Sequence, residues 1–97
     1  MNILWTKKAI DGWQEVADYI LAEFGKDAFL SFEQRTNEAE KTIALMPNIG
    51  SIEWSDTTNK VVFRYITINK RSKILYYIGN DVIYIADFWD VRKNKPA

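Results

Sequence analysis

The sequence predicts an α+β fold, in which an opening strand and a two-helix antiparallel hairpin pack on an antiparallel sheet of three or four strands. One observation is that residues 7–46 contain two amphipathic segments with a period of 3.6 residues, separated by a short break at Gly25. A second is that the last third of the chain contains three β-rich runs, at residues 61–68, 74–78 and 82–89. Their connections are too short for crossover helices, so we expect an antiparallel meander.

The first helix is expected to follow directly on a short strand at residues 3–5. Thr6 can cap this helix, because its side-chain oxygen can accept a hydrogen bond from a backbone amide of the first turn. Gly25 is expected to end it. The apolar positions that should form its buried face are Ala9, Ile10, Trp13, Val16, Ala17, Ile20 and Phe24.

The second helix is expected to begin near Asp27, which can cap it, and to end before Pro47. The connection of two or three residues makes the two helices an antiparallel pair. Residues 52–54 then form either a brief strand or an extended arm. The positions of the second helix that should be buried are Ala28, Phe32, Ala39, Ile43 and Met46.

Length and composition indicate one domain that spans residues 1–97, with a hydrophobic share of 47% that is typical of a packed protein. The chain has no cysteine and no histidine, which argues against disulfides, a thiolate nucleophile and a zinc site. We therefore expect no metal and no cofactor. The sequence shows neither a signal peptide nor an apolar run long enough to span a membrane, so a cytoplasmic protein is expected.

The net charge of zero conceals an asymmetry between the two halves of the chain. Residues 1–46 carry five basic and eight acidic side chains, whereas residues 47–97 carry eight basic and five acidic ones. This offset is compatible with ordinary solvated faces. It is also compatible with a basic binding surface on the sheet, where Arg64, Arg71, Lys73 and Arg92 could converge on a phosphate or on a carboxylate-rich partner.

The first run of the meander is apolar on both of its alternating sets of side chains. Arg64 belongs to one set, with Val62, Ile66 and Ile68; Phe63 and Tyr65 belong to the other, with Val61 and Thr67. Periodicity alone does not indicate which set faces the helices. Because helices are available for only one face, the other needs a different cover, for which a partner chain is the obvious candidate.

Several segments, in this order and spacing, resemble the RelE/ParE superfamily, the toxins of type II toxin-antitoxin modules. The matching segments cover nearly the whole chain and end in Trp-Asp-Val-Arg. They are Trp5-Thr6 with Ala9, residues 17–20 with 24–25, Ala28 with Phe32, and residues 45–50, 63–64, 66–70, 73–78 and 82–92.

The resemblance implies a toxin held inactive by a cognate antitoxin. ParE-like members inhibit growth by binding a protein target, DNA gyrase, whereas RelE-like members cleave mRNA on the ribosome without a metal. A third alternative is an inactive member that still binds an antitoxin. The ParE-like function is favoured here, because a neutral chain gains little from counterion release on RNA.

If the protein were a nuclease, the candidate catalytic residues would be Arg64, Arg92, Lys60 and Lys73. Arginines would stabilise the charge that develops on phosphorus, and a lysine of lowered pKa would act as the base. Many RelE-like members also have a tyrosine or histidine close to the C-terminus, but only Lys-Asn-Lys-Pro-Ala follows Arg92. Arg64 has a structural alternative, which is to stack on Tyr77 or to pair with Asp87.

A protein that acts by binding another protein needs exposed apolar and charged contact residues rather than an acid-base pair. The candidates for this role are Trp54, Trp89, Arg71 and Lys93. Trp89 could instead cover the edge of the core, and Arg71 is a turn residue for which simple solvation is the common outcome. Trp5 and Trp13 are expected in the core.

Overall fold

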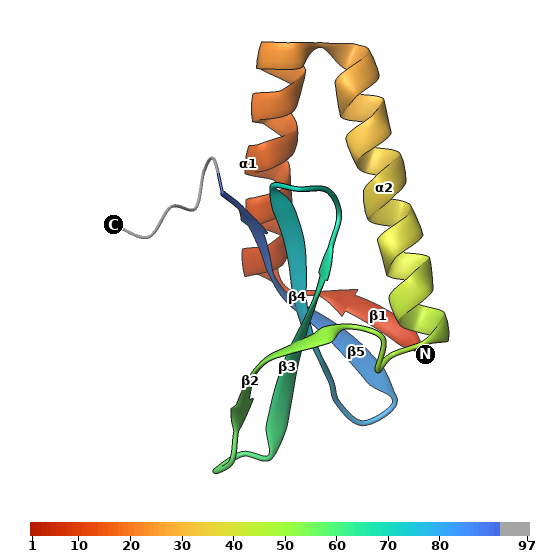
Figure 1. The fold of residues 1–97 in the computed structure, drawn as a ribbon, viewed down its shortest axis with the longest axis vertical. Coiled ribbons are helices and arrows are strands. Elements are labelled where there is room, and N and C mark those ends of the chain that lie inside the picture. Colours follow the sequence, from red (N-terminus) through yellow and green to blue (C-terminus); the bar gives the residue numbers. More distant parts are fainter. Residues whose placement is uncertain (92–97) are drawn as a thin grey trace.

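The computed structural model describes residues 1–91, and Arg92 to Ala97 lie outside the described part of the chain. Two long helices form an antiparallel hairpin that stands beside a twisted sheet (Figure 1). In chain order the elements are β1 (Asn2–Trp5), α1 (Lys7–Phe24), α2 (Lys26–Leu45), β2 (Ser51–Asp56), β3 (Val61–Thr67), β4 (Ser72–Ile78) and β5 (Val82–Asp90).

The sheet has five strands in the order β1-β5-β4-β3-β2. The antiparallel meander expected from the sequence is confirmed and runs from β2 to β5. The expected strand number was too low, because β2 is a strand of six residues that pairs with β3 and β1 joins the sheet by pairing parallel with β5. The sheet is therefore mixed. This pairing joins residues at opposite ends of the sequence, such as Ile3 and Ile83, and no local pattern in a four-residue strand could reveal it.

Helix α1 begins and ends where the sequence predicted. The Thr6 side chain accepts a hydrogen bond from the backbone amide of Ala9, at 3.2 Å, and its hydroxyl donates to the carbonyl of Ile85, at 2.9 Å. Thr6 thus caps the helix and joins it to β5. Gly25 follows the last turn with φ +91°, a conformation that favours glycine. Ile10 and Phe24 were wrongly assigned to the buried face, since both are at least half exposed.

Helix α2 begins one residue earlier than expected, at Lys26, and Gly25 is its N-cap without a side-chain hydrogen bond. Asp27 therefore does not cap the helix but lies in its first turn, where a carboxylate still interacts favourably with the helix dipole. The helix ends at Leu45, before Pro47. Met46 is exposed rather than buried, because it lies beyond the last turn.

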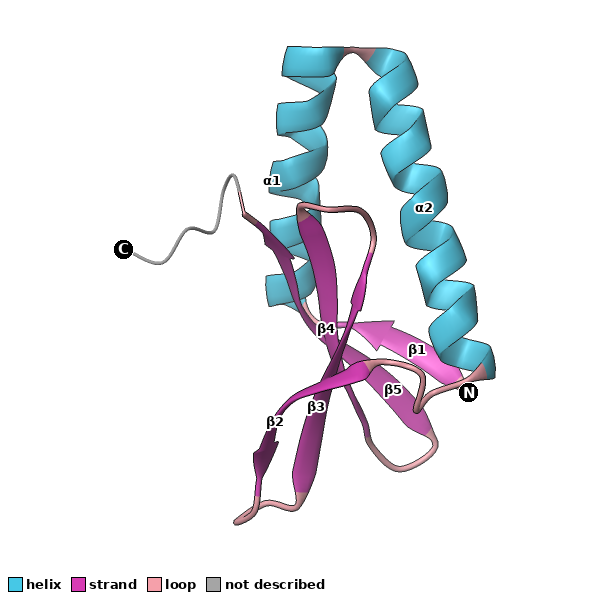
Figure 2. Ribbon diagram, viewed as in Figure 1, coloured by secondary structure: helices cyan, strands magenta, loops and turns pink. Residues whose placement is uncertain are grey.

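The core lies between the helix hairpin and one face of the sheet. Phe88 of β5 is fully buried, and its ring packs edge-on against Phe32 of α2, with 5.6 Å between ring centroids. Trp13 stacks on Phe32 and donates a hydrogen bond to Thr36, at 3.0 Å, which satisfies its indole N–H. The fully buried residues that the sheet contributes are Ile74, Tyr76, Ile83, Ile85 and Phe88. Both helices lie on this side of the sheet (Figure 2).

No helix within residues 1–91 is both long and apolar enough to cross a membrane.

Candidate functional site

The sheet face that the helices leave uncovered carries a continuous row of aromatic side chains, which we call the aromatic row. It consists of Trp54, Phe63, Tyr77 and Tyr84, one from each of β2, β3, β4 and β5. Adjacent ring centroids are 4.5 Å, 5.3 Å and 5.1 Å apart. Trp54, at the edge strand, is 50% exposed, and the other three are half-buried. Ring-to-ring contact fixes these side chains and offers a partner a rigid apolar surface.

A second cluster lies on the same face, around the ammonium group of Lys73. Lys73 forms an ion pair with Glu53, with 2.8 Å between Nζ and Oε1. The same ammonium lies 4.4 Å from the ring centroid of Tyr65 and 4.6 Å from that of Trp89. Cation-π contact and the ion pair together hold Lys73 in place.

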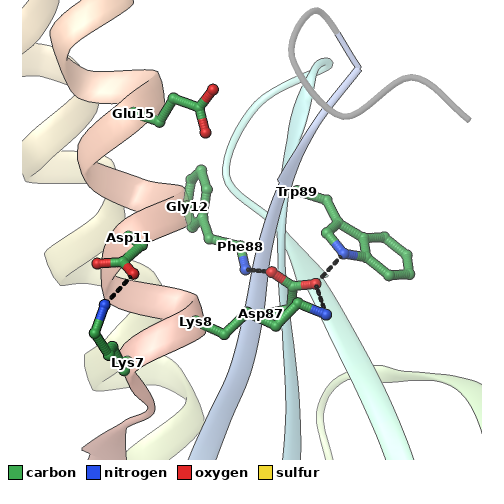
Figure 3. Close-up of a pocket in the computed structure, with 8 residues that line it drawn as sticks. All are labelled: Lys7, Lys8, Asp11, Gly12, Glu15, Asp87, Phe88 and Trp89. Atoms are coloured by element: carbon green, nitrogen blue, oxygen red, sulfur yellow. Dashed lines mark hydrogen bonds and ion pairs between the residues drawn. The ribbon is translucent and has the colours of Figure 1, made fainter.

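A pocket of about 590 Å³ lies between α1 and the upper part of β5 (Figure 3). At this pocket α1 passes very close to the strand, since a Cβ added at Gly12 would lie 2.9 Å from the carbonyl oxygen of Phe88. Lys8 reaches across β5 toward Asp87, at 3.3 Å (Figure 3). The Asp87 carboxylate also accepts hydrogen bonds from the indole N–H of Trp89 and from the backbone amide of Phe88, at 2.6 Å and 2.8 Å.

The remaining lysine of this pocket is paired as well. Lys7 binds Asp11 one turn along the helix, at 2.7 Å, and this hydrogen bond and the charge of Asp11 raise the pKa of Lys7. Both lysines of the pocket are therefore held by carboxylates of this chain. The pocket joins α1 to β5 and presents little unbalanced charge to a ligand.

Arg64 lies on the helix side of the sheet, because it is paired with the buried Tyr76 in the β3–β4 register. Its guanidinium donates to the backbone carbonyls of Asn48 and Gly50, at 3.3 Å and 2.9 Å. The predicted stacking on Tyr77 and pairing with Asp87 are both wrong, because both residues lie on the opposite face. Arg64 instead secures the loop between α2 and β2.

Tyr76 also holds the loop between α2 and β2 in place. Its hydroxyl accepts a hydrogen bond from the backbone amide of Gly50, at 2.9 Å, and donates one to the carbonyl of Pro47, at 2.8 Å. Burial raises the pKa of Tyr76 above its ordinary value of 10.0, partly opposed by the hydrogen bond from Gly50 and the charge of Arg64. A neutral, donating hydroxyl is the form that this contact requires.

The candidate nuclease residues within the described part of the chain are not brought together. Arg64 and Lys73 extend from opposite faces of the sheet. Lys60 lies in the turn between β2 and β3, with φ +58°, about 13 Å along the strand from Arg64. Arg92 lies outside the described residues. The expected convergence of basic side chains is therefore wrong for Arg64 and Lys73.

Of the candidate partner-binding residues, Trp54 and Trp89 lie on the same uncovered face, Trp54 in the aromatic row and Trp89 in the Lys73 cluster. Arg71 is exposed in the turn between β3 and β4. Lys93 lies outside the described residues. Sequence reasoning missed Glu53, and it did not assign Phe63, Tyr77 and Tyr84 to one contact surface. Their role depends on cross-strand register, which alternation within one strand does not give.

Within residues 1–91 there is no cluster of acidic, cysteine or histidine side chains of the kind that holds a metal ion.

No protein-family model matches the sequence. No curated protein matches it either. Among solved structures, the chain resembles one from "Chromosomal ParDE TA system from P. aeruginosa", with a TM-score of 0.73 and 20% sequence identity. The match covers 93% of this chain and 95% of that one. The α+β fold expected from the resemblance to the RelE/ParE superfamily is therefore confirmed: the chain has the fold of a component of a ParDE toxin-antitoxin system.

Proposed function

We propose that this protein is the toxin of a type II toxin-antitoxin module, that it inhibits growth by binding a protein target such as DNA gyrase, and that a cognate antitoxin neutralises it. The observation that carries the proposal is the likeness in fold to a chain of a ParDE toxin-antitoxin system over nearly the whole length of both chains. Because fold alone does not define function, we infer the mode of action from the side chains on the surface of the protein.

The uncovered sheet face supports protein binding as the mode of action. The aromatic row gives four adjacent rings on four strands, and interface hot spots are enriched in such rigid aromatic side chains. Trp54 is the most exposed aromatic of the row and stands at the edge of the sheet, where a partner can reach it without displacing another element. We propose Trp54 and Trp89 as contact residues on this face.

The alternative of metal-independent mRNA cleavage has less support. It needs a base and charge-stabilising cations around one scissile phosphate. The candidate residues do not surround one point: Lys60 lies in a hairpin turn, Arg64 on the helix side of the sheet, and Lys73 on the uncovered side. Arg64 is moreover engaged with two backbone carbonyls of its own chain.

The proposal is tested by inducing the protein in bacteria, with and without its genomic neighbour, and by adding the purified protein to DNA gyrase in a supercoiling assay. Growth arrest, relief by the neighbouring gene product and loss of supercoiling are expected. Cuts at the ribosomal A site, mapped by primer extension while gyrase remains active, would identify an mRNA nuclease instead. Normal growth on induction of the folded protein would refute the toxin assignment.

The contact surface is tested with Trp54→Ala, which should weaken gyrase inhibition at least about tenfold, as for a central aromatic contact. The matched control is Phe24→Ala. Phe24 is also an exposed aromatic, 58% exposed, but it lies at the far end of the helix hairpin from the aromatic row. Equal effects of the two substitutions would show that the aromatic row is not the contact surface.

A further inference from the structure

A groove of about 590 Å³ lies where the β3–β4 turn meets the end of β5. We call it the turn groove; Lys70, Arg71, Lys73, Trp89 and Val91 contribute to its lining. In Figure 1 the β3–β4 turn lies beside the end of β5, and Ser72 and Asp90 are register partners at this position. The turn groove is separate from the α1–β5 pocket, with which it shares only Trp89 among its lining residues.

The turn groove is held rigidly by hydrogen bonds within the chain. The side chain of Asn69 accepts from the backbone amides of Arg71 and Ser72, at 2.7 Å and 2.9 Å, which fixes the turn. The amide of Val91 donates to the carbonyl of Arg71, at 2.8 Å, and the Ser72 hydroxyl donates to the buried carboxylate of Asp90, at 2.6 Å. A ligand would therefore meet a surface that needs little ordering.

Trp89 supplies the apolar part of the turn groove. Its indole N–H is bound to Asp87, and the ammonium of Lys73 lies over its ring. These contacts fix the orientation of the ring while leaving it half-buried rather than covered. Val91, which is 59% exposed, extends the apolar surface.

The charge at the turn groove is unbalanced and positive. Lys70 and Arg71 are exposed, and neither forms an ion pair with any residue in the range 1–91. Lys73 is already paired with Glu53, so the first two are the cations that a ligand can engage.

We propose that the turn groove binds an acidic segment of a partner protein, which places an apolar side chain against Trp89 and pairs its carboxylates with Lys70 and Arg71. This inference rests on the proposed function, because it gives the chemistry of a protein segment that such a toxin would contact. Arginine suits the role, since its planar guanidinium can bind a carboxylate through two parallel hydrogen bonds.

A protein segment fits this face better than a nucleic acid strand. A single strand carries a phosphate on every nucleotide, and binding it requires a cationic track as well as stacking platforms. Beyond the turn groove, Lys73 and Lys8 are already paired with Glu53 and Asp87, so they offer no continuing cationic track to a phosphate backbone. A peptide, by contrast, can have acidic residues opposite Lys70 and Arg71 and uncharged residues along the rest of its length.

The direct test measures fluorescence anisotropy of a labelled short peptide of alternating Glu and Leu, titrated with the full-length protein. A matched peptide in which every Glu is replaced by Gln should bind at least about tenfold more weakly. Affinity for the acidic peptide should fall as ionic strength is raised from about 0.05 M to about 0.5 M, because exposed ion pairs are screened. Equal binding of the two peptides would refute the inference.

Variants assign the binding to the turn groove. Arg71→Gln and Lys70→Gln should each weaken binding of the Glu-Leu peptide by about three- to tenfold. Val91→Asp places a carboxylate at an exposed position of the groove and should weaken it further without disturbing the core. Lys41→Gln is the control, because Lys41 is an exposed cation on α2 that does not line the groove. If Lys41→Gln weakens binding as much as Arg71→Gln, the assignment to this groove is wrong.

The remaining outcomes identify other occupants. Tighter binding of a labelled single-stranded oligonucleotide than of the acidic peptide, with loss in Arg71→Gln, would make the groove a polyanion site. Self-association that Arg71→Gln abolishes, measured by analytical ultracentrifugation, would assign the groove to a second copy. Gyrase inhibition without peptide binding would refute only this inference, whereas peptide binding by a protein that does not inhibit growth would refute only the toxin assignment.

Discussion

Both faces of the sheet carry apolar side chains, but the two faces differ in how these side chains are covered. On the helix side, Ile74, Ile85 and Phe88 are fully buried under α1 and α2. On the other side, Trp54 is half exposed. Within residues 1–91, the rings that contact the ring of Tyr77 are those of Phe63 and Tyr84, which lie on the same face. The difference indicates that the side chains of the covered face supply stability, whereas the aromatic row of the uncovered face is available for recognition.

The largest expected effect is that of truncation on the covered face. Phe88→Ala should lower the free energy of unfolding by about 3–5 kcal/mol, because it removes a fully buried ring and leaves a cavity beside Phe32. Tyr77→Ala on the uncovered face should cost only about 1–2 kcal/mol. Urea unfolding followed by tryptophan fluorescence measures both. Similar losses would mean that the uncovered face contributes to stability as much as the covered one.

The contact of the helix hairpin with the covered face can be tested at Gly12. Gly12→Val should lower the free energy of unfolding by about 1–3 kcal/mol, because its Cβ would lie 2.9 Å from the carbonyl oxygen of Phe88 and force α1 away from β5. Gln14→Ala, at an exposed position of the same helix, should change stability by less than about 0.5 kcal/mol. Thermal unfolding of the two variants provides the comparison, and an unchanged melting temperature for Gly12→Val would contradict the close approach.

At the edge of the covered face, the attachment of the loop between α2 and β2 depends on the protonation state of Tyr76. Tyr76→Phe should cost about 1–2 kcal/mol, because the Gly50 amide and the Pro47 carbonyl lose their partner. Burial raises the folded-state pKa above the ordinary value of 10.0, so the unfolded chain loses this proton first. The stabilisation is therefore complete below about pH 10 and decreases as pH rises from there through the folded-state pKa.

The difference in unfolding free energy between the wild type and Tyr76→Phe, measured from about pH 8 to about pH 11, isolates this contribution from that of the other tyrosines. It should shrink as pH rises. Tyr77→Phe serves as the control, because its hydroxyl lies on the uncovered face. A pH-independent difference for Tyr76→Phe would contradict the role assigned to its proton.

The smallest effect is expected for the ion pair on the uncovered face. Lys73 and Glu53 are each about one quarter exposed, so their coupling should be about 0.5–1 kcal/mol and should decrease in high salt. A double-mutant cycle with Lys73→Gln and Glu53→Gln measures it. A coupling of several kcal/mol would show that this cluster is part of a second stabilising core.

Local patterns in the sequence were sufficient to predict the helix hairpin and the meander. Thr6 and Gly25 define the ends of α1 by capping chemistry that acts within one turn, and short connections leave β3, β4 and β5 no alternative to antiparallel pairing. What could not be predicted depends on long-range pairing. The parallel β1–β5 ladder joins distant residues, and the position of Arg64 on the helix side is set by its register with Tyr76.

The candidate site was predicted only in part for the same reason. Trp54 and Trp89 were each proposed as contact residues from their own positions in the chain. Their observed contacts come from other strands, through Phe63 for Trp54 and Lys73 for Trp89. A single strand of alternating apolar residues does not reveal which neighbours stand opposite. The cross-strand register, once known, shows that the uncovered face is an organised surface.

The pairing of β1 with β5 also determines when the sheet and the core of this protein can form during its synthesis. β5 lies between β1 and β4 and packs against α1, yet it is translated after every element that it joins. Until residues 82–90 have left the ribosome, β1 lacks its strand partner and both helices lack their contact with Phe88. Folding of such a non-local pairing is therefore expected to follow translation of β5 rather than to accompany it. A nascent chain that stops short of β5 should have neither a closed core nor a complete aromatic row.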